Sequence, residues 1–97
     1  MFLHIAAVRY LDAYRLELGF SDGSWGVADL SDELRGPVFS ELLDQGLFSR
    51  VALNSELGTI QWPNGADLAP EFLYFLSFKN DRAQSSKFKA WGFVAED

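Results

Sequence analysis

The chain has 97 residues, of which 48% are hydrophobic and 15% aromatic, and it contains no cysteine. This composition predicts one small domain with a packed, ring-rich interior, and it excludes a mostly disordered chain, a disulfide framework and any thiolate site. The formal net charge is −6, so we do not expect nucleic acid as a general partner, because an acidic body repels a phosphate backbone.

The charge is distributed unevenly along the chain. Residues 1–78 contain eleven acidic and four basic residues, whereas residues 79–97 contain four basic and three acidic residues. No apolar run reaches the roughly 20 residues that a membrane span needs, and the N-terminus lacks the basic start of a signal peptide. We therefore expect a cytoplasmic protein with no membrane partner.

The first third of the chain predicts an antiparallel meander. Apolar and polar residues alternate strictly over residues 14–20, as in a half-buried strand. Strands are also predicted over residues 3–10 and 24–29. Asp22 and Gly23, placed between two such runs, predict a hairpin with a two-residue turn.

The two connections of the meander set its predicted register. A two-residue turn at Asp22 and Gly23 would place Phe20 opposite Trp25 and Leu18 opposite Val27. A three-residue connection at residues 11–13 would likewise place Val8 opposite Leu16. In this register all three strands present one shared apolar face, with Trp25 and Val27 on it.

The middle of the chain predicts helices and a second hairpin. Pro37 suits the first turn of a helix that Gly46 ends, and residues 50–54 and 59–62 form two further strands. A last helix is predicted over residues 68–78, with Asp67 as its cap. The fold class is therefore α+β: antiparallel hairpins with about five strands, expected in one sheet, and two or three short helices in a single small domain.

The last predicted helix and the C-terminal segment are unusually apolar. The helix is apolar nearly all round, so either several elements cover it or part of it is an interface. We assign residues 1–78 to the globular domain and residues 79–97 to a polar linker with an aromatic segment, which docks on its own domain, docks on a partner, or stays disordered. The candidate interface residues are aromatic or aliphatic side chains of these two segments: Phe72, Phe75, Leu76, Phe78, Phe88, Trp91 and Phe93.

No catalytic or cofactor motif stands out, and we expect no cofactor and no enzyme. His4 is the only histidine and has no partner motif. The carboxylates of Asp22, Asp29 and Asp67 could form a metal or acid–base set, but each has a local explanation in a turn, a strand end or a helix cap. Candidate residues for a ligand pocket or its rim lie on the strands and the turn after them: Trp25, Trp62, Asn64 and Asp67.

Several stretches together resemble a known family. They are Tyr10–Leu16, Phe20–Gly23, Val27–Ser31, Gly36–Phe39, Leu47–Phe48 and, most specifically, the Trp-Pro-Asn-Gly-Ala-Asp sequence within Gly58–Leu68. The pattern looks like the bacterial domain of unknown function number 2442, over residues 3–76. The resemblance implies a small α+β domain with no assigned activity. Some members of that family look like the first domain of a longer chain with a helix-turn-helix, and others look like partners of small toxin-like proteins.

Three functional hypotheses follow. The first is a protein-interaction or regulatory module, in its finer form an antitoxin-like partner of a small, basic, toxin-like protein. The second is a small-ligand sensor that uses Trp25 or Trp62, and the third is a small enzyme that uses the carboxylates. Nothing after residue 78 resembles a helix-turn-helix, so the DNA-binding role of the longer members is not carried over. The apolar excess of the last helix also predicts a homodimer.

Overall fold

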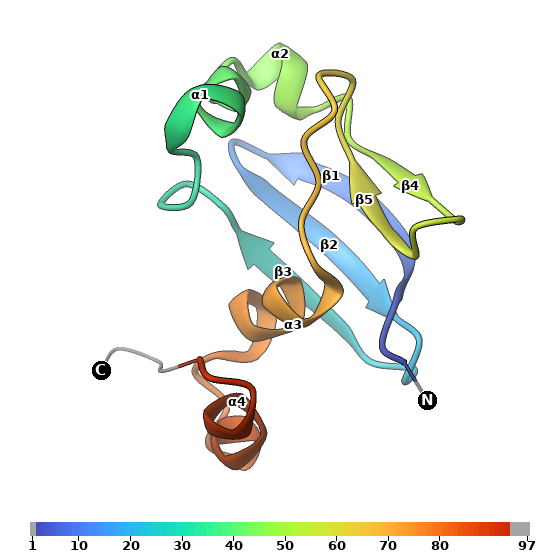
Figure 1. Cartoon of the computed structure of the whole chain (residues 1–97), viewed down its shortest axis with the longest axis vertical. Coiled ribbons are helices and arrows are strands. Elements are labelled where there is room, and N and C mark those ends of the chain that lie inside the picture. The colour runs from blue at the N-terminus through green and yellow to red at the C-terminus, as the bar shows by residue number, and fades with distance from the viewer. Residues whose placement is uncertain (1, 94–97) are drawn as a thin grey trace.

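A computed structural model gives the architecture of residues 2–93, and the α+β prediction is confirmed. The strands are β1 (Ile5–Asp12), β2 (Arg15–Phe20), β3 (Trp25–Asp29), β4 (Ala52–Asn54) and β5 (Thr59–Gln61). The helices are α1 (Gly36–Phe39), α2 (Gln45–Phe48), α3 (Pro70–Phe78) and α4 (Ser85–Ala90), with short 3₁₀ turns at Ser40–Leu43 and Arg82–Gln84. Figure 1 shows the meander β1–β2–β3 as one layer, with the β4–β5 hairpin and α3 in front of it.

The five strands form two antiparallel sheets rather than the single sheet expected from the sequence. One sheet has the order β1-β2-β3, and β4 and β5 form the other. The hairpin touches β1 at one end, where the Ile5 N–H donates to the Gly58 carbonyl at 2.8 Å. Beyond that contact no ladder continues between them, so the short hairpin packs against the meander instead of extending it.

The predicted register of the first connection is wrong by two residues. Val8 pairs with Leu18, and Asp12 pairs with Arg15, so β1 continues further than expected and only two residues connect the strands. Two features close this tight turn: Ala13 has a φ of 43°, and Arg15 binds the Asp12 carboxylate through two hydrogen bonds of 2.7 Å. A shift of two residues leaves the apolar face of β1 on the same side.

The predicted register of the second connection is wrong by one residue, which has a larger consequence. The Phe20 N–H donates to the Ser24 carbonyl, and Gly23 has a φ of 89°, so the loop contains three residues rather than two. Gly19 therefore pairs with Trp25. Because side chains alternate along a strand, this slip moves Trp25 and Val27 from the predicted core face to the outer face of the sheet.

The stretch from Pro37 to Gly46 is not one helix. It forms α1 and a 3₁₀ turn, and the chain then leaves the helical path at Asp44. The Asp44 carboxylate accepts hydrogen bonds from the N–H groups of Gly46 and Leu47, which starts α2. Gly46 therefore lies inside a helix instead of ending one.

The core lies on the inner face of the meander. Leu16, Leu18 and Phe20 of β2 are buried there, and Phe48 of α2 and Trp62 after β5 close the other side. The phenyl ring of Phe48 packs edge-on against Tyr14 at 5.3 Å and lies 5.6 Å from the Trp62 ring. This cluster joins the meander, the helical connection and the second hairpin in one core.

Helix α3 lies over β3 and is covered on its other side by α4. A Cβ built on Gly26 would lie 2.8 Å from the Ser77 Cβ, so the helix approaches the strand closely. On the far side, the Phe88 ring is 2% exposed and meets the Phe75 ring edge-on at 5.2 Å. Two elements thus explain why the helix is apolar nearly all round. Its N-cap is Ala69 rather than the predicted Asp67.

Candidate functional site

The outer face of the three-stranded sheet carries the largest exposed aromatic side chain of the strands. Trp25 is 60% exposed, and Val27, two residues further along β3, is 41% exposed. The indole lies across β2, because a Cβ built on Gly19 would be 2.9 Å from the Trp25 ring. The ring therefore lies flat on the sheet with one face open to solvent. We call this surface the Trp25 face.

The rest of the Trp25 face is charged but internally paired. Arg9 and Glu17, neighbours on β1 and β2, form an ion pair of 3.2 Å. Arg15 and Asp12 form a second pair of 2.7 Å at the first turn, and its hydrogen bond lowers the pKa of Asp12. Both pairs are open to solvent, with side chains between 33% and 69% exposed, so they contribute little to stability. They leave an apolar area around Trp25 bordered by charges of both signs.

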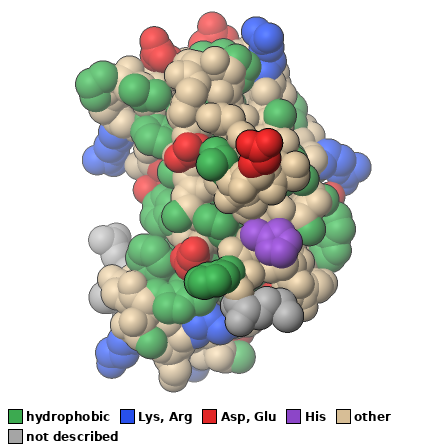
Figure 2. All heavy atoms as spheres, turned by 45° about the vertical axis from the view of Figure 1, so that its right-hand side comes forward, with side chains coloured by type: hydrophobic (Ala, Val, Ile, Leu, Met, Phe, Trp, Pro, Cys, Tyr) green, Lys and Arg blue, Asp and Glu red, His purple; other side chains and the backbone are tan. Residues whose placement is uncertain are grey.

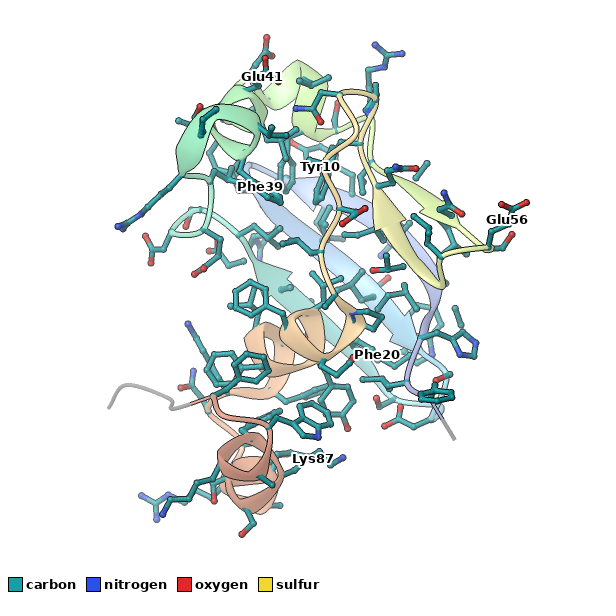
Figure 3. The ribbon with its side chains drawn as sticks, viewed as in Figure 1. Tyr10, Phe20, Phe39, Glu41, Glu56 and Lys87 are labelled. Carbon is teal, nitrogen blue, oxygen red and sulfur yellow. The ribbon has the colours of Figure 1, made fainter. Side chains whose placement is uncertain are left out.

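A second candidate site lies where the β2–β3 loop meets the two C-terminal helices. It is a cavity of about 250 Å³ lined by Phe2, Leu3, Ser21, Asp22, Tyr74, Lys87 and Trp91. The Tyr74 hydroxyl donates to the Asp22 carboxylate at 3.0 Å. The Lys87 ammonium lies 4.8 Å from the centre of the Tyr74 ring, and Figure 3 shows Lys87 reaching from α4 toward the side where the chain begins.

The charge state of this second site follows from its contacts. Partial burial raises the pKa of Asp22, but hydrogen bonds from Ser24 and Tyr74 outweigh it. The nearby ammonium of Lys87 acts in the same direction, and the pKa of Asp22 lies below its ordinary value. A carboxylate and an ammonium therefore face one small cavity with an indole at its wall.

The predicted interface residues lie together, but they mostly contact one another. The Phe93 ring stacks on Phe75 at 5.0 Å and meets Phe72 at 5.9 Å. Phe88 and Leu76 are buried, and Trp91 is 38% exposed. Much of the apolar excess that suggested a homodimer is therefore covered by α4 of the same chain.

The four predicted ligand or rim residues do not form one site. Trp62 is only 2% exposed, so the expectation of a rim position is wrong: its indole N–H donates to the Phe48 carbonyl at 2.9 Å. The Asn64 amide donates to the Val38 carbonyl and to Glu41, which ties the turn to the helical connection. Asp67 is exposed and bridges to Gln61 through the backbone.

The three carboxylates considered from the sequence, those of Asp22, Asp29 and Asp67, do not form one group. Asp22 lies in the loop before β3, and Asp29 is the last residue of that strand. Asp29 accepts a hydrogen bond from the Ser31 N–H, as a turn residue does. Within residues 2–93, no three His, Asp or Glu side chains are grouped closely enough to hold a metal ion. His4 is exposed, and Figure 2 shows the single histidine at the surface.

Sequence reasoning missed the site around Asp22, Tyr74 and Lys87. Asp22 and Tyr74 are 52 residues apart, and the turn position of Asp22 already explained its presence. In the sequence, Lys87 was only one of the four basic residues counted within residues 79–97. No local pattern links these three residues, because only the packing of the β2–β3 loop, α3 and α4 against one another brings them together.

The family described as "Protein of unknown function (DUF2442)" matches residues 5–79. The chain belongs to this family. The resemblance stated from the sequence is thus confirmed, and the family assigns no activity. No curated protein matches the sequence significantly.

One solved structure is similar over nearly the whole chain. It is the crystal structure of the "Putative DNA Binding Protein NE0471" from Nitrosomonas europaea ATCC 19718, with 26% sequence identity and a TM-score of 0.74. The match covers 93% of the present chain but 59% of that protein. Part of the Nitrosomonas protein therefore has no counterpart here. Among residues 2–93, no helix is long and apolar enough to cross a bilayer.

Proposed function

We propose that this member of the DUF2442 family is a protein-interaction module of the cytoplasm, and that its partner docks on the Trp25 face. The observation that carries the proposal is the Trp25 ring, which is 60% exposed and lies flat on a sheet face that no described element covers. Tryptophan is enriched among the residues that dominate binding energy at protein interfaces.

The net charge favours a basic partner. The chain carries a formal charge of −6, and a field of one sign speeds encounter with a protein of the opposite sign. In its finer form, the proposal is an antitoxin-like module that neutralises a small, basic, toxin-like protein. On the Trp25 face, Glu17 and Asp12 would exchange their present arginine partners for cations of that protein.

DNA binding is not part of this proposal, although the similar Nitrosomonas protein carries that description. Its name applies to a longer chain, of which this one covers 59%. Eleven of the fifteen charged side chains in residues 1–78 are acidic. A surface of that sign works against the phosphate contacts that supply most nonspecific affinity for DNA.

The proposal is tested by capture from native cells with tagged full-length chains. The variants are Trp25→Ala and, as a matched control, Leu57→Ala, which removes an exposed side chain on the remote β4–β5 turn. We expect wild type and Leu57→Ala to retain one basic protein in stoichiometric amount, and Trp25→Ala to lose it. Raising the salt concentration should elute that protein, because screening weakens attraction between opposite charges. Equal retention by all three chains, or retention of nothing, contradicts the proposal.

A second candidate function is small-ligand binding in the cavity of about 250 Å³ next to α4. Its support is the convergence of the Asp22 carboxylate and the Lys87 ammonium beside the Trp91 indole, which suits a small zwitterion with an apolar part. A metabolite panel followed by tryptophan fluorescence tests it. A compound that shifts the emission of wild type but not of Lys87→Ala supports this function, and no response across the panel counts against it.

A further inference from the structure

The cavity next to α4 already holds a cation of the chain itself. The Lys87 ammonium lies 4.8 Å from the centre of the Tyr74 ring and 5.8 Å from that of the Trp91 ring. A cation within about 6 Å of an aromatic face is attracted by the negative face of the ring. The two rings meet at 70°, with their centroids 5.9 Å apart. The ammonium therefore lies in a corner formed by two aromatic walls.

A fixed carboxylate stands beside this corner. Asp22 Oδ1 accepts hydrogen bonds from the N–H and the hydroxyl of Ser24, and Oδ2 accepts from the Tyr74 hydroxyl at 3.0 Å. The Tyr74 hydroxyl in turn accepts from the Gln84 amide at 3.4 Å. The pKa of Asp22 lies below its ordinary value, so its carboxylate is charged at neutral pH. Two aromatic walls and a negative charge thus converge on one point.

Lys87 holds this position only weakly. It is an exposed residue of α4, and neither of the two ion pairs within residues 2–93 includes it. A lysine ammonium is compact and strongly hydrated, and it sits on a flexible stem, so a cation–π contact at an exposed site costs little to break. Lys87 can therefore turn outward, which leaves the corner and the Asp22 charge open to another cation in the cavity of about 250 Å³.

We propose that this cavity binds a small zwitterion whose cationic end is an alkylated ammonium group, and that Lys87 occupies the place of that group in the structure. The ammonium of the ligand lies between Tyr74 and Trp91 beside Asp22, and Lys87 turns outward to pair with the carboxylate of the ligand. Recognition of quaternary ammonium groups is a common use of aromatic walls. This inference rests on the second candidate function, small-ligand binding, and names its ligand class.

The charges and the lining of the cavity agree with this ligand class. The chain has a net charge of −6, and a field of that sign attracts cations and repels anions. With Lys87 turned outward, each charge of the zwitterion has an opposite charge of the chain as its partner. The lining also includes Phe2 and Leu3, which offer apolar surface to the alkyl groups of the ligand.

NMR titration of the nitrogen-labelled full chain with three probes tests the ligand class. The probes are glycine betaine, which carries both charges, choline, which carries only the ammonium, and dimethylbutanol, the uncharged isostere of choline with carbon in place of nitrogen. Wild type should bind glycine betaine more tightly than choline, with a shift of the Trp91 indole N–H signal, and dimethylbutanol most weakly. Equal binding of choline and dimethylbutanol would overturn the proposal, because the cavity would then recognise apolar shape rather than charge.

The variant Lys87→Gln should reverse the order of the two charged probes. Choline should bind about two- to fivefold more tightly, because the competing ammonium is gone. Glycine betaine should bind more weakly than in wild type, because its carboxylate loses its partner. Lys89→Gln is the matched control: it removes the same charge from the same helix at a residue that does not line the cavity, and it should keep the wild-type order. A wild-type order in Lys87→Gln would overturn the proposal.

A second pair of variants tests the aromatic wall. Trp91→Ala should weaken glycine betaine by at least about two- to fivefold, whereas Trp25→Ala removes an exposed indole from the outer face of the sheet and should bind like wild type. Equal affinities in these two variants would contradict the site. If these probes fail while another zwitterion of the metabolite panel binds, the ligand class is wrong and small-ligand binding stands. If the whole panel fails as well, both are wrong.

Discussion

The placement of α3 over β3 predicts opposite outcomes for two glycines of the same sheet. In Gly26→Ala, the new Cβ would lie 2.8 Å from the Ser77 Cβ and 2.9 Å from the Phe78 ring. Ser77 Cβ is fixed to the helix backbone and cannot move alone. Overpacking of this kind costs about 1–3 kcal/mol, while replacing a strand glycine by alanine gains about 0.5–1 kcal/mol. The free energy of unfolding should therefore fall, by up to about 2.5 kcal/mol.

Gly19→Ala is the matched control on the neighbouring strand. Its Cβ would lie 2.9 Å from the Trp25 ring, as close as the first contact. That ring is 60% exposed and belongs to a flexible side chain, so it can rotate away at small cost. We expect Gly19→Ala to have unchanged or slightly raised stability, by at most about 1 kcal/mol.

Urea unfolding followed by far-ultraviolet circular dichroism measures both variants on one scale. The midpoint of Gly26→Ala should lie clearly below that of Gly19→Ala. If the turn had only two residues, Gly26 would lie on the solvent face, and its replacement by alanine would stabilise the protein. A Gly26→Ala variant as stable as Gly19→Ala would therefore refute both the observed register and the packing of α3 on β3.

Three further predictions concern the core and the pH dependence. Phe88→Ala removes a ring that is 2% exposed and should lower the free energy of unfolding by about 3–5 kcal/mol; an unchanged thermal midpoint would show that α4 does not unfold with the core. Trp62→Phe removes the indole donor of the buried Phe48 carbonyl and leaves it the Val51 N–H at 3.3 Å, so it should cost about 0.5–1.5 kcal/mol in urea unfolding, whereas an effect near zero would show that the second donor compensates. The folded-state pKa of Asp22 is lowered, so its stabilising contribution is present above the unfolded value of about 3.9 and is lost as pH falls through the folded value. The stability difference between wild type and Asp22→Asn should therefore shrink in acid, and a difference that stays constant down to the lowest pH would contradict this assignment.

Local patterns identified most secondary-structure elements because each pattern has a local physical cause. The alternation over residues 14–20 predicts a half-buried strand, and Gly23 indicates a turn that needs a positive φ. The turn type was not determined, since a glycine in the left-handed region serves both two-residue and three-residue hairpin loops. One residue of difference in that loop decided whether Trp25 faced the core or solvent.

The candidate sites were harder to predict from the sequence than the strands. Trp25 is the first residue of β3 and Trp62 directly follows β5, yet one is 60% exposed and the other 2%. The sequence predicted both as pocket residues and did not show that one is buried and the other exposed. The burial of each side chain depends on which element covers the face on which it lies. The apolar excess of α3 was correctly noticed, but whether α4 or another chain covers it is a question of tertiary packing.

The sequence by itself determined that this protein is one α+β domain of the DUF2442 family, with antiparallel hairpins, an acidic body and no cysteine. These properties depend on composition, on the two-residue period of strands and on short-range turn chemistry. Each of these can be read from the composition or from a few neighbouring residues. Only the tertiary structure decided the register that exposes Trp25 and the meeting of Asp22 with Tyr74 and Lys87. Each of these depends on contacts between residues distant in the chain, whose energies are settled by the packing of the whole domain.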